Sequence, residues 1–149
     1  NNIIHGDLTT SNMILKDDKN KSRYHLYSSL NENELRNASF AADLVVSRAG
    51  ASSIFEIAAW GKPSILIPLE NSAQDHQKKN AWGYAASGAC EVVEEENLAP
   101  HILVSEINNI IKNPEKRQKM KEEALKFSRL DAAESIANEI INLALEHTN

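Results

Sequence analysis

Two short apolar runs, each followed by a helical pattern, constrain the fold of this chain more than any other feature. Residues 43–47 and 64–68 are centred on continuous apolar stretches, which are typical of parallel strands covered on both faces. Helical patterns follow at residues 52–60 and 75–87. Because alternating strands and helices form mostly parallel sheets with right-handed crossovers, the sequence predicts an α/β fold: a Rossmann-like parallel sheet flanked by helices.

Cap residues and helix breakers give the expected bounds of these two helices. Ser52 or Ser53 is expected to cap the helix through Trp60, because a serine hydroxyl accepts hydrogen bonds from free first-turn amides. Gly61 is expected to end this helix and Gly88 the next one, since helices favour glycine just past their last turn.

Further elements extend the alternation. Asn31 and the acidic residues after it predict a helix through Phe40. A proline near the first turn opens each of two later helices. Strands are expected at 23–30 and 90–93, and helices at 100–111, 114–127 and 131–145. The last helix gathers six apolar residues on one face: Ala133, Ile136, Ala137, Ile140, Ile141 and Leu145.

Composition limits the class of protein. With 149 residues, 42% of them hydrophobic, the chain is long enough for one ordinary core. A net charge of −5 argues against nucleic-acid binding, which needs an excess of Lys and Arg. Cys90 has no second cysteine to pair with, so we expect a buried thiol in a reducing cytoplasm. No apolar run approaches the ~20 residues that span a bilayer. The chain begins without Met, so we expect a fragment of a longer protein.

The turn after residues 43–47 is the first candidate site. Ligands of open parallel sheets collect at the carboxyl ends of the strands. There, Gly50, Ala51, Ser52 and Ser53 would let the backbone approach a ligand, and the free amides of the following helix would favour a diphosphate. Small residues before a helix also serve close packing alone, and both interpretations stay open on spacing.

Glu56 follows in the same helix, so its carboxylate would face the same crevice and accept hydrogen bonds from two adjacent ribose hydroxyls. The alternative is a solvated first-turn glutamate that the helix dipole stabilises. A second polar loop, residues 69–80, carries amide and carboxylate groups suited to reading sugar hydroxyls.

Three blocks in order resemble the signature of the MurG family of glycosyltransferases. They are ADLVVSRAGASSIFEI at 42–57, GKPSILIPL at 61–69 and DHQKKNA at 75–81. The resemblance runs from about residue 31 to the end, and includes the opening of the last helix at 131–134. It divides the chain into a poorly assigned segment, 1–30, and a UDP-sugar-binding Rossmann-like domain, 31–149.

The resemblance implies the C-terminal half of a two-domain GT-B enzyme, the half that binds UDP-N-acetylglucosamine. Residues 50–53 would present amides to the diphosphate, and Arg48 would brace the turn or the phosphates. Glu56 would hold the ribose, and residues 30–35 would lie beside the uracil. Gln77 would read the sugar, with three polar neighbours close by: Asp75, His76 and Asn80.

The family's reaction is transfer of N-acetylglucosamine, with inversion and without metal or cofactor, to undecaprenyl-diphosphate-muramyl-pentapeptide in peptidoglycan synthesis. Fixed dipoles and amides must therefore stabilise the leaving UDP. The resemblance places the general base and the lipid-linked acceptor with an N-terminal half missing from this chain. It implies a peripheral enzyme at the cytoplasmic face of the bacterial membrane, and a chain that alone binds donor without transferring it.

The amino-terminal string IIHGDLTTSNMI, residues 3–14, is similar instead to the catalytic loop of a small atypical protein kinase. Asp7 would be the base and Asn12 a magnesium ligand there. A phosphate-covering glycine-rich loop, an ATP lysine and Asp-Phe-Gly are missing from the sequence. Convergence of a strand and loop, a hybrid sequence and a kinase-related fragment all stay open.

Two alternatives to the main interpretation also remain. The chain would serve as the donor-binding subunit of a split GT-B enzyme that needs a membrane-anchored partner. In the second alternative, the donor is a UDP-sugar other than UDP-N-acetylglucosamine. This stays open because selectivity for sugar hydroxyls depends on one or two side chains around Gln77.

Overall fold

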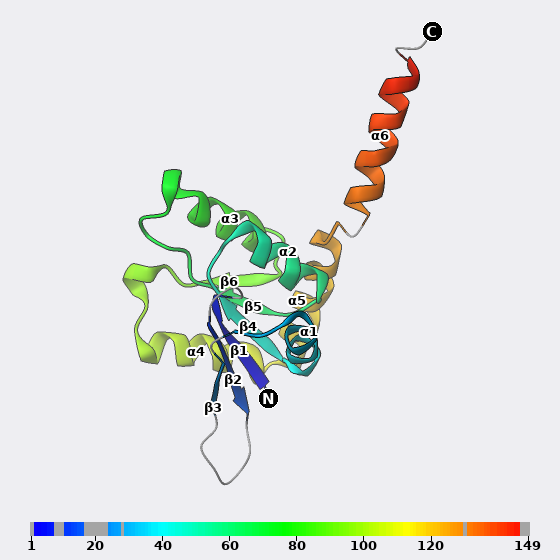
Figure 1. Ribbon diagram of the computed structural model, residues 1–149. Coiled ribbons are helices and arrows are strands. Elements are labelled where there is room, and N and C mark those ends of the chain that lie inside the picture. The colour runs from blue at the N-terminus through cyan, green and yellow to red at the C-terminus, as the bar shows by residue number, and fades with distance from the viewer. Residues whose placement is uncertain (1, 8–10, 17–23, 28, 130, 147–149) are drawn as a thin grey trace.

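A six-stranded sheet in the order β3-β2-β1-β4-β5-β6 organises the computed structural model (Figure 1). The structure describes residues 2–7, 11–16, 24–27, 29–129 and 131–146. The strands are β1 (Asn2–Asp7), β2 (Ser11–Lys16), β3 (Tyr24–Tyr27), β4 (Leu44–Ser47), β5 (Ser64–Leu66) and β6 (Cys90–Val92). The helices are α1 (Glu32–Ala41), α2 (Ala51–Ala59), α3 (His76–Ala85), α4 (Pro100–Ile111), α5 (Pro114–Phe127) and α6 (Ala132–Glu146), with short 3₁₀ turns η1 (Ala73–Asp75) and η2 (Glu95–Asn97).

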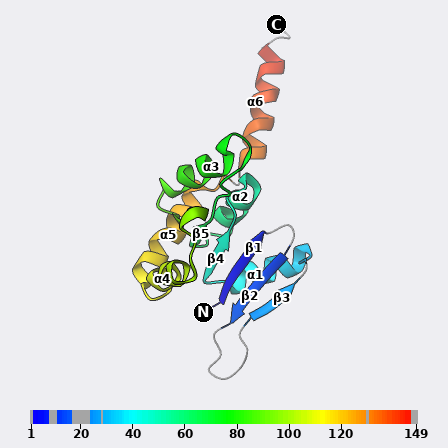
Figure 2. The ribbon, with the colours of Figure 1, turned by 90° about the vertical axis from the view of Figure 1, so that its left-hand side faces the viewer.

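Four neighbouring strands of this sheet, β1, β4, β5 and β6, run parallel. Val46 of β4 lies opposite Ile65 of β5, which in turn lies opposite Glu91 of β6. The strands β1, β2 and β3 form an antiparallel meander at the other side of the sheet, where Figure 2 shows them side by side. The α/β fold and the strands expected near 43–47, 64–68 and 90–93 are therefore confirmed.

Helices cover both faces of the parallel strands, which explains the continuous apolar runs. Val45 packs with residues of α1, α2 and α3 in one buried cluster, whereas its neighbours Leu44 and Val46 pack with α4 in the other. Ile65 and Leu66 of β5 divide between the two clusters in the same way, and both are fully buried. Burying an aliphatic side chain of this size contributes about 1.5–3 kcal/mol.

The helix termini confirm most of the expected caps. Asn31 accepts a hydrogen bond from the Glu34 N–H at 3.0 Å, and the Glu34 carboxylate accepts from the Asn31 N–H at 2.9 Å, which completes a capping box. Gly61 and Gly88 follow α2 and α3 with φ of 59° and 84°. The helices α4 and α5 each begin at the expected proline.

The prediction that Ser52 or Ser53 caps α2 is wrong. The helix begins at Ala51, and its N-cap is Gly50, which makes no side-chain cap bond. Both serines therefore lie inside the first turn, where a residue can no longer act as the N-cap. The helix thus begins at Ala51, one residue before the start of the helical pattern predicted at 52–60.

Helix α6 is present at the expected place and extends away from the sheet in both views (Figures 1 and 2). Three of its apolar residues, Ile136, Ile140 and Leu145, are each 61% exposed. Among the helices of the described residues, none combines the length and apolar character needed to cross a bilayer.

The expectation of a buried thiol is confirmed at Cys90, the first residue of β6. Cys90 is 5% exposed and belongs to the buried cluster that it shares with residues of α2 and α3. Burial, reinforced by the nearby Glu91 charge, raises the pKa of the Cys90 thiol to about 12.

Candidate functional site

The carboxyl ends of β4, β5 and β6 lie at one edge of the sheet, because the three strands are parallel neighbours. The segments that leave them are residues 48–50, 67–75 and 93–99. The residues predicted to bind the diphosphate, the ribose and the sugar lie in the first two segments or in the helices α2 and α3 that follow them. This edge is where open α/β sheets bind their ligands.

The first segment ends at the amino terminus of α2. Gly50 is the N-cap, and Ala51 and Ser52 are exposed, whereas Ser53 is buried. Gly50 has a φ of −66°, and a Cβ built there would meet Ser53 Oγ at an ordinary 3.8 Å. Neither backbone strain nor packing therefore requires glycine at this position. Because Gly50 has no side chain, it places no side-chain atoms over the free amides of the α2 first turn.

Glu56 lies farther along α2, about 7.5 Å from Ala51 at the usual rise of an α-helix. Its side chain is exposed and lines a cavity of about 580 Å³ between α1 and α2. Leu35 and Arg36 of α1 line the same cavity. The structure thus places Glu56 beside residues 30–35, the stretch expected near the uracil.

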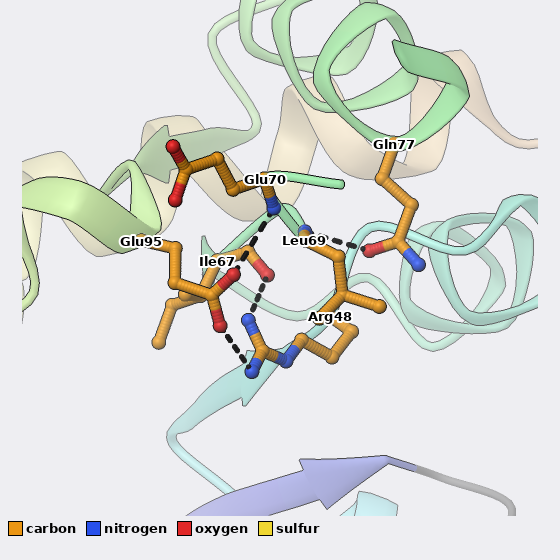
Figure 3. A network of polar contacts seen from close by, with 6 residues as sticks. All are labelled: Arg48, Ile67, Leu69, Glu70, Gln77 and Glu95. Atoms are coloured by element: carbon orange, nitrogen blue, oxygen red, sulfur yellow. Dashed lines mark hydrogen bonds and ion pairs between the residues drawn. The ribbon is translucent and has the colours of Figure 1, made fainter. Parts of the chain in front are cut away.

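Arg48 takes part in a polar network between strand ends (Figure 3). Its Nη2 donates to Oε1 of Glu95 at 2.8 Å, and its Nη1 donates to the carbonyl oxygen of Ile67 at 3.4 Å. The guanidinium of Arg48 is therefore held along the edge of the sheet, where it joins the ends of β4 and β5 to η2.

Glu95 also accepts a hydrogen bond from the Glu70 N–H, at 3.0 Å to Oε2. These interactions, first the Glu70 N–H and then the Arg48 guanidinium, lower the pKa of the Glu95 carboxyl. Sequence reasoning missed Glu95. It lies in a run of three glutamates at 94–96, in which no spacing signal distinguishes the one that meets Arg48.

Gln77 lies near the start of α3 and closes the loop that leaves β5. Its Oε1 accepts from the Leu69 N–H at 3.1 Å, and its own N–H donates to Ser72 Oγ at 3.2 Å. Asp75, directly before α3, has a φ of 57°, which is uncommon for a residue other than glycine. Asp75 and His76 have exposed side chains at this end of the helix.

Asn80, one turn farther along α3, reaches the first segment. Its Nδ2 donates to the carbonyl oxygen of Ala49 at 3.3 Å. The structure therefore brings the third sequence block against the first, next to the amino terminus of α2.

The string at 3–14 that is similar to a kinase loop contributes to the same sheet. Residues 2–7 and 11–16 form β1 and β2, and Ile4 of β1 lies opposite Val45 of β4. The middle of the string, residues 8–10, lies outside the described residues.

Comparison with known proteins identifies a family and relatives that are similar to this chain in sequence. Residues 10–136 match the glycosyltransferase family 28 C-terminal domain. A protein of Geobacter sulfurreducens is 38% identical over 100 residues, which are 67% of this chain and 28% of the relative. A protein of Thermodesulfovibrio yellowstonii is 43% identical over 95 residues, 64% of this chain and 26% of the relative. Both are named UDP-N-acetylglucosamine–N-acetylmuramyl-(pentapeptide) pyrophosphoryl-undecaprenol N-acetylglucosamine transferase.

A solved structure supports the same relationship. The crystal structure of Acinetobacter baumannii MurG superimposes with a TM-score of 0.66 and 25% sequence identity, over 76% of this chain and 32% of that one. The chain thus spans less than a third of the length of the relatives that it matches. Because the domain match covers most of the sequence, the chain belongs to the family of glycosyltransferase family 28 C-terminal domains.

Proposed function

We propose that this chain is the donor-binding part of an N-acetylglucosaminyltransferase, and that it binds UDP-N-acetylglucosamine at the carboxyl edge of the sheet. One observation carries the proposal: α3, with Gln77 and Asn80, is tied directly to the turn that opens α2. Groups suited to a diphosphate, a ribose and a sugar thereby surround one edge. The names of the relatives, which act on the same donor, support the choice of ligand.

The diphosphate would bind at the amino terminus of α2. The free amides of residues 51–53 point toward the start of the helix, where the dipole also favours negative charge. Gly50 leaves this end accessible, since it adds no side chain over the amides. Arg48, whose guanidinium is held by Glu95 and Ile67, would support the turn from the side rather than contact the phosphates.

The nucleoside would occupy the cavity between α1 and α2. Glu56 lines this cavity and offers two carboxylate oxygens, which can accept hydrogen bonds from both ribose hydroxyls. Leu35 lines the same cavity and would pack beside the uracil. The spacing along α2 separates the diphosphate amides from Glu56 by about two turns or less.

The sugar would be read by α3 and the loop before it. Gln77 has its Oε1 occupied by the Leu69 N–H. Ligand hydroxyls would therefore meet its Nε2 group, which carries two N–H donors. Asp75, His76 and Asn80 are the neighbouring polar groups from which further contacts with the sugar would come.

During transfer, negative charge develops on the departing UDP. The amides and dipole of α2 are fixed before the reaction, so they would stabilise this charge without reorganisation. The general base and the site for the lipid-linked acceptor would come from the part of the full protein that has no counterpart in this chain. The full protein would then act at the cytoplasmic face of the bacterial membrane, and the chain alone would bind donor without transferring it.

Calorimetric titration tests the proposal with three ligands: UDP-N-acetylglucosamine, UDP-glucose and ATP with magnesium. We expect selective binding of UDP-N-acetylglucosamine. Glu56→Ala should weaken it by about tenfold or more, because hydrogen bonds to a charged group contribute about 1.5–3 kcal/mol. Glu115→Ala, which removes an exposed glutamate from the first turn of α5, is the matched control and should leave binding unchanged.

Three results would contradict the proposal. A folded chain that binds no UDP-sugar would exclude donor binding. Equal losses in the two alanine variants would exclude the site at Glu56. Binding of ATP with magnesium alone would favour the kinase-related alternative.

A further inference from the structure

Two consecutive backbone N–H groups in the loop after β5 are held by side chains from two different elements. The Leu69 N–H donates to Gln77 of α3, and the Glu70 N–H donates to Glu95 of η2 (Figure 3). The two peptide groups that flank Leu69 are therefore each held by one side chain. The position of the Gln77 amide is linked through Leu69, which lies between these two peptides, to the Glu95 carboxylate.

Glu95 is anchored in turn by Arg48. One carboxylate oxygen of Glu95 binds the guanidinium at 2.8 Å, and the other accepts the Glu70 N–H at 3.0 Å. Arg48 also reaches the carbonyl oxygen of Ile67, at the beginning of the same loop. The Glu95 carboxylate thus connects all three segments that leave the parallel strands β4, β5 and β6.

Two residues farther along the same loop adopt a backbone conformation that is uncommon outside glycine. Gln74 and Asp75 both have positive φ, 53° and 57°, directly before α3. This conformation is unfavourable for residues other than glycine and persists where surrounding contacts hold it. Gln77 follows two residues later, so its orientation depends on how firmly the loop is held.

We propose that Glu95 is a positioning residue for sugar recognition, which acts through Glu70 and Leu69 to orient the amide of Gln77. This inference rests on the proposed function and adds to it a residue outside the three sequence blocks. In this proposal Glu95 makes no contact with the donor itself. Its loss should therefore affect the sugar more than the nucleotide.

Titrations of the chain with UDP and with UDP-N-acetylglucosamine separate these two parts of the donor. Glu95→Ala should weaken binding of UDP-N-acetylglucosamine by about fivefold to tenfold, the worth of about one hydrogen bond to a charged or polar group. Binding of UDP, which lacks the sugar, should stay within about twofold, since no contact of the α2 amides or Glu56 is removed. Glu95→Gln keeps a carbonyl acceptor and should give an intermediate loss. Glu115→Ala is again the control.

A double-mutant cycle with Gln77→Ala tests whether Glu95 acts through Gln77. In the Gln77→Ala background, Glu95→Ala should cause little further loss of sugar discrimination, because coupled residues are not additive. Additive losses would overturn the inference, as would equal weakening of UDP and UDP-N-acetylglucosamine, which indicates a general structural role. An unchanged Glu95→Ala variant would also overturn it. Failure of the unsubstituted chain to bind UDP at all would instead overturn the proposed function, and the inference with it.

Discussion

The side-chain amide of Asn80 donates a hydrogen bond to the carbonyl oxygen of Ala49, with 3.3 Å between Nδ2 and the oxygen. Ala49 directly precedes Gly50, the N-cap of α2, so this bond ties α3 to the turn with the free amides. Two parts of the sequence that are 31 residues apart meet here. The arrangement of the candidate site depends on this contact.

Asn80→Asp tests that contact with a side chain of the same shape. The substitution removes the N–H donor and places a carboxylate beside a carbonyl oxygen, so we expect a loss of about 1–3 kcal/mol in the free energy of unfolding. Binding of UDP-N-acetylglucosamine should also weaken, since the new charge repels a diphosphate. Urea denaturation and calorimetry measure the two effects. Asn109→Asp, at an exposed position of α4, is the control, and equal behaviour of both variants would contradict the role of Asn80.

Gly61→Ala should destabilise the fold at the end of α2. Gly61 has a φ of 59°, and a Cβ at this position would meet Leu125 Cγ at 2.8 Å. Left-handed backbone costs about 1–2 kcal/mol for a residue with a Cβ, and crowding of a packed side chain costs about 1–3 kcal/mol.

Gly83→Ala is the matched comparison for that substitution, measured in the same urea titration. A Cβ at Gly83 meets no heavy atom of the described structure within 4 Å, and the residue lies inside α3. The variant should be neutral or more stable by about 0.5–1 kcal/mol, because alanine favours the helix. A Gly61→Ala chain as stable as Gly83→Ala would show that Leu125 does not pack against the α2 end as described.

The Cys90 thiol should be unreactive in the folded chain. Burial raises its pKa to about 12, and only the thiolate attacks disulfide reagents. At pH 8 we expect labelling by a thiol reagent to be slow and to accelerate when urea unfolds the chain. The sequence has one cysteine, so the signal reports Cys90 alone. Rapid labelling without denaturant would contradict the burial of β6.

The carboxyl of Glu95 should titrate below its ordinary value. The Glu70 N–H and the Arg48 guanidinium both favour the charged form and lower the pKa from 4.5. A lowered carboxyl pKa stabilises the fold above the unfolded pKa, and this contribution is lost as the pH falls through the folded value. The stability difference between the unsubstituted chain and Glu95→Gln should therefore be constant near neutral pH and shrink in acid below 4.5.

Carboxyl-detected NMR titration measures this pKa directly. Arg48→Met removes one of the two interactions, so the pKa of Glu95 should rise while the Glu70 bond keeps part of the shift. A pKa of Glu95 at or above 4.5 in the unsubstituted chain would show that the carboxylate does not bridge the two segments.

Much of the fold could be predicted because it depends on local pattern. The apolar runs in β4 and β5 are covered on both faces, so the hydrophobicity of residues 65 to 68 correctly predicts that they are buried. Pro100 and Pro114 set the starts of α4 and α5 in the same way, since proline favours the first helical position. Gly61 and Gly88 likewise mark the helix ends, where the backbone has positive φ.

The features that could not be predicted depend on contacts between distant residues. The start of α2 at Ala51 follows from where β4 ends, whereas the general preference of helix caps for serine favours Ser52 or Ser53. Glu95 gains its role from Arg48, which lies 47 residues earlier and on another segment. The exposure of Ile136 and Ile140 on α6 has no signal in the sequence either, because an apolar helix face ordinarily indicates burial.

We propose that the donor binds at the amino terminus of α2 and along its first turns. Amide NMR spectra of the chain, recorded during addition of UDP-N-acetylglucosamine, test it most directly. We predict saturable shift changes at Gly50, Ala51, Ser52 and Ser53, with smaller changes at Gln77 and none on α4, which covers the opposite face of the sheet. Saturable changes confined to α4, α5 or α6, with the amides of the α2 first turn unaffected, would contradict it.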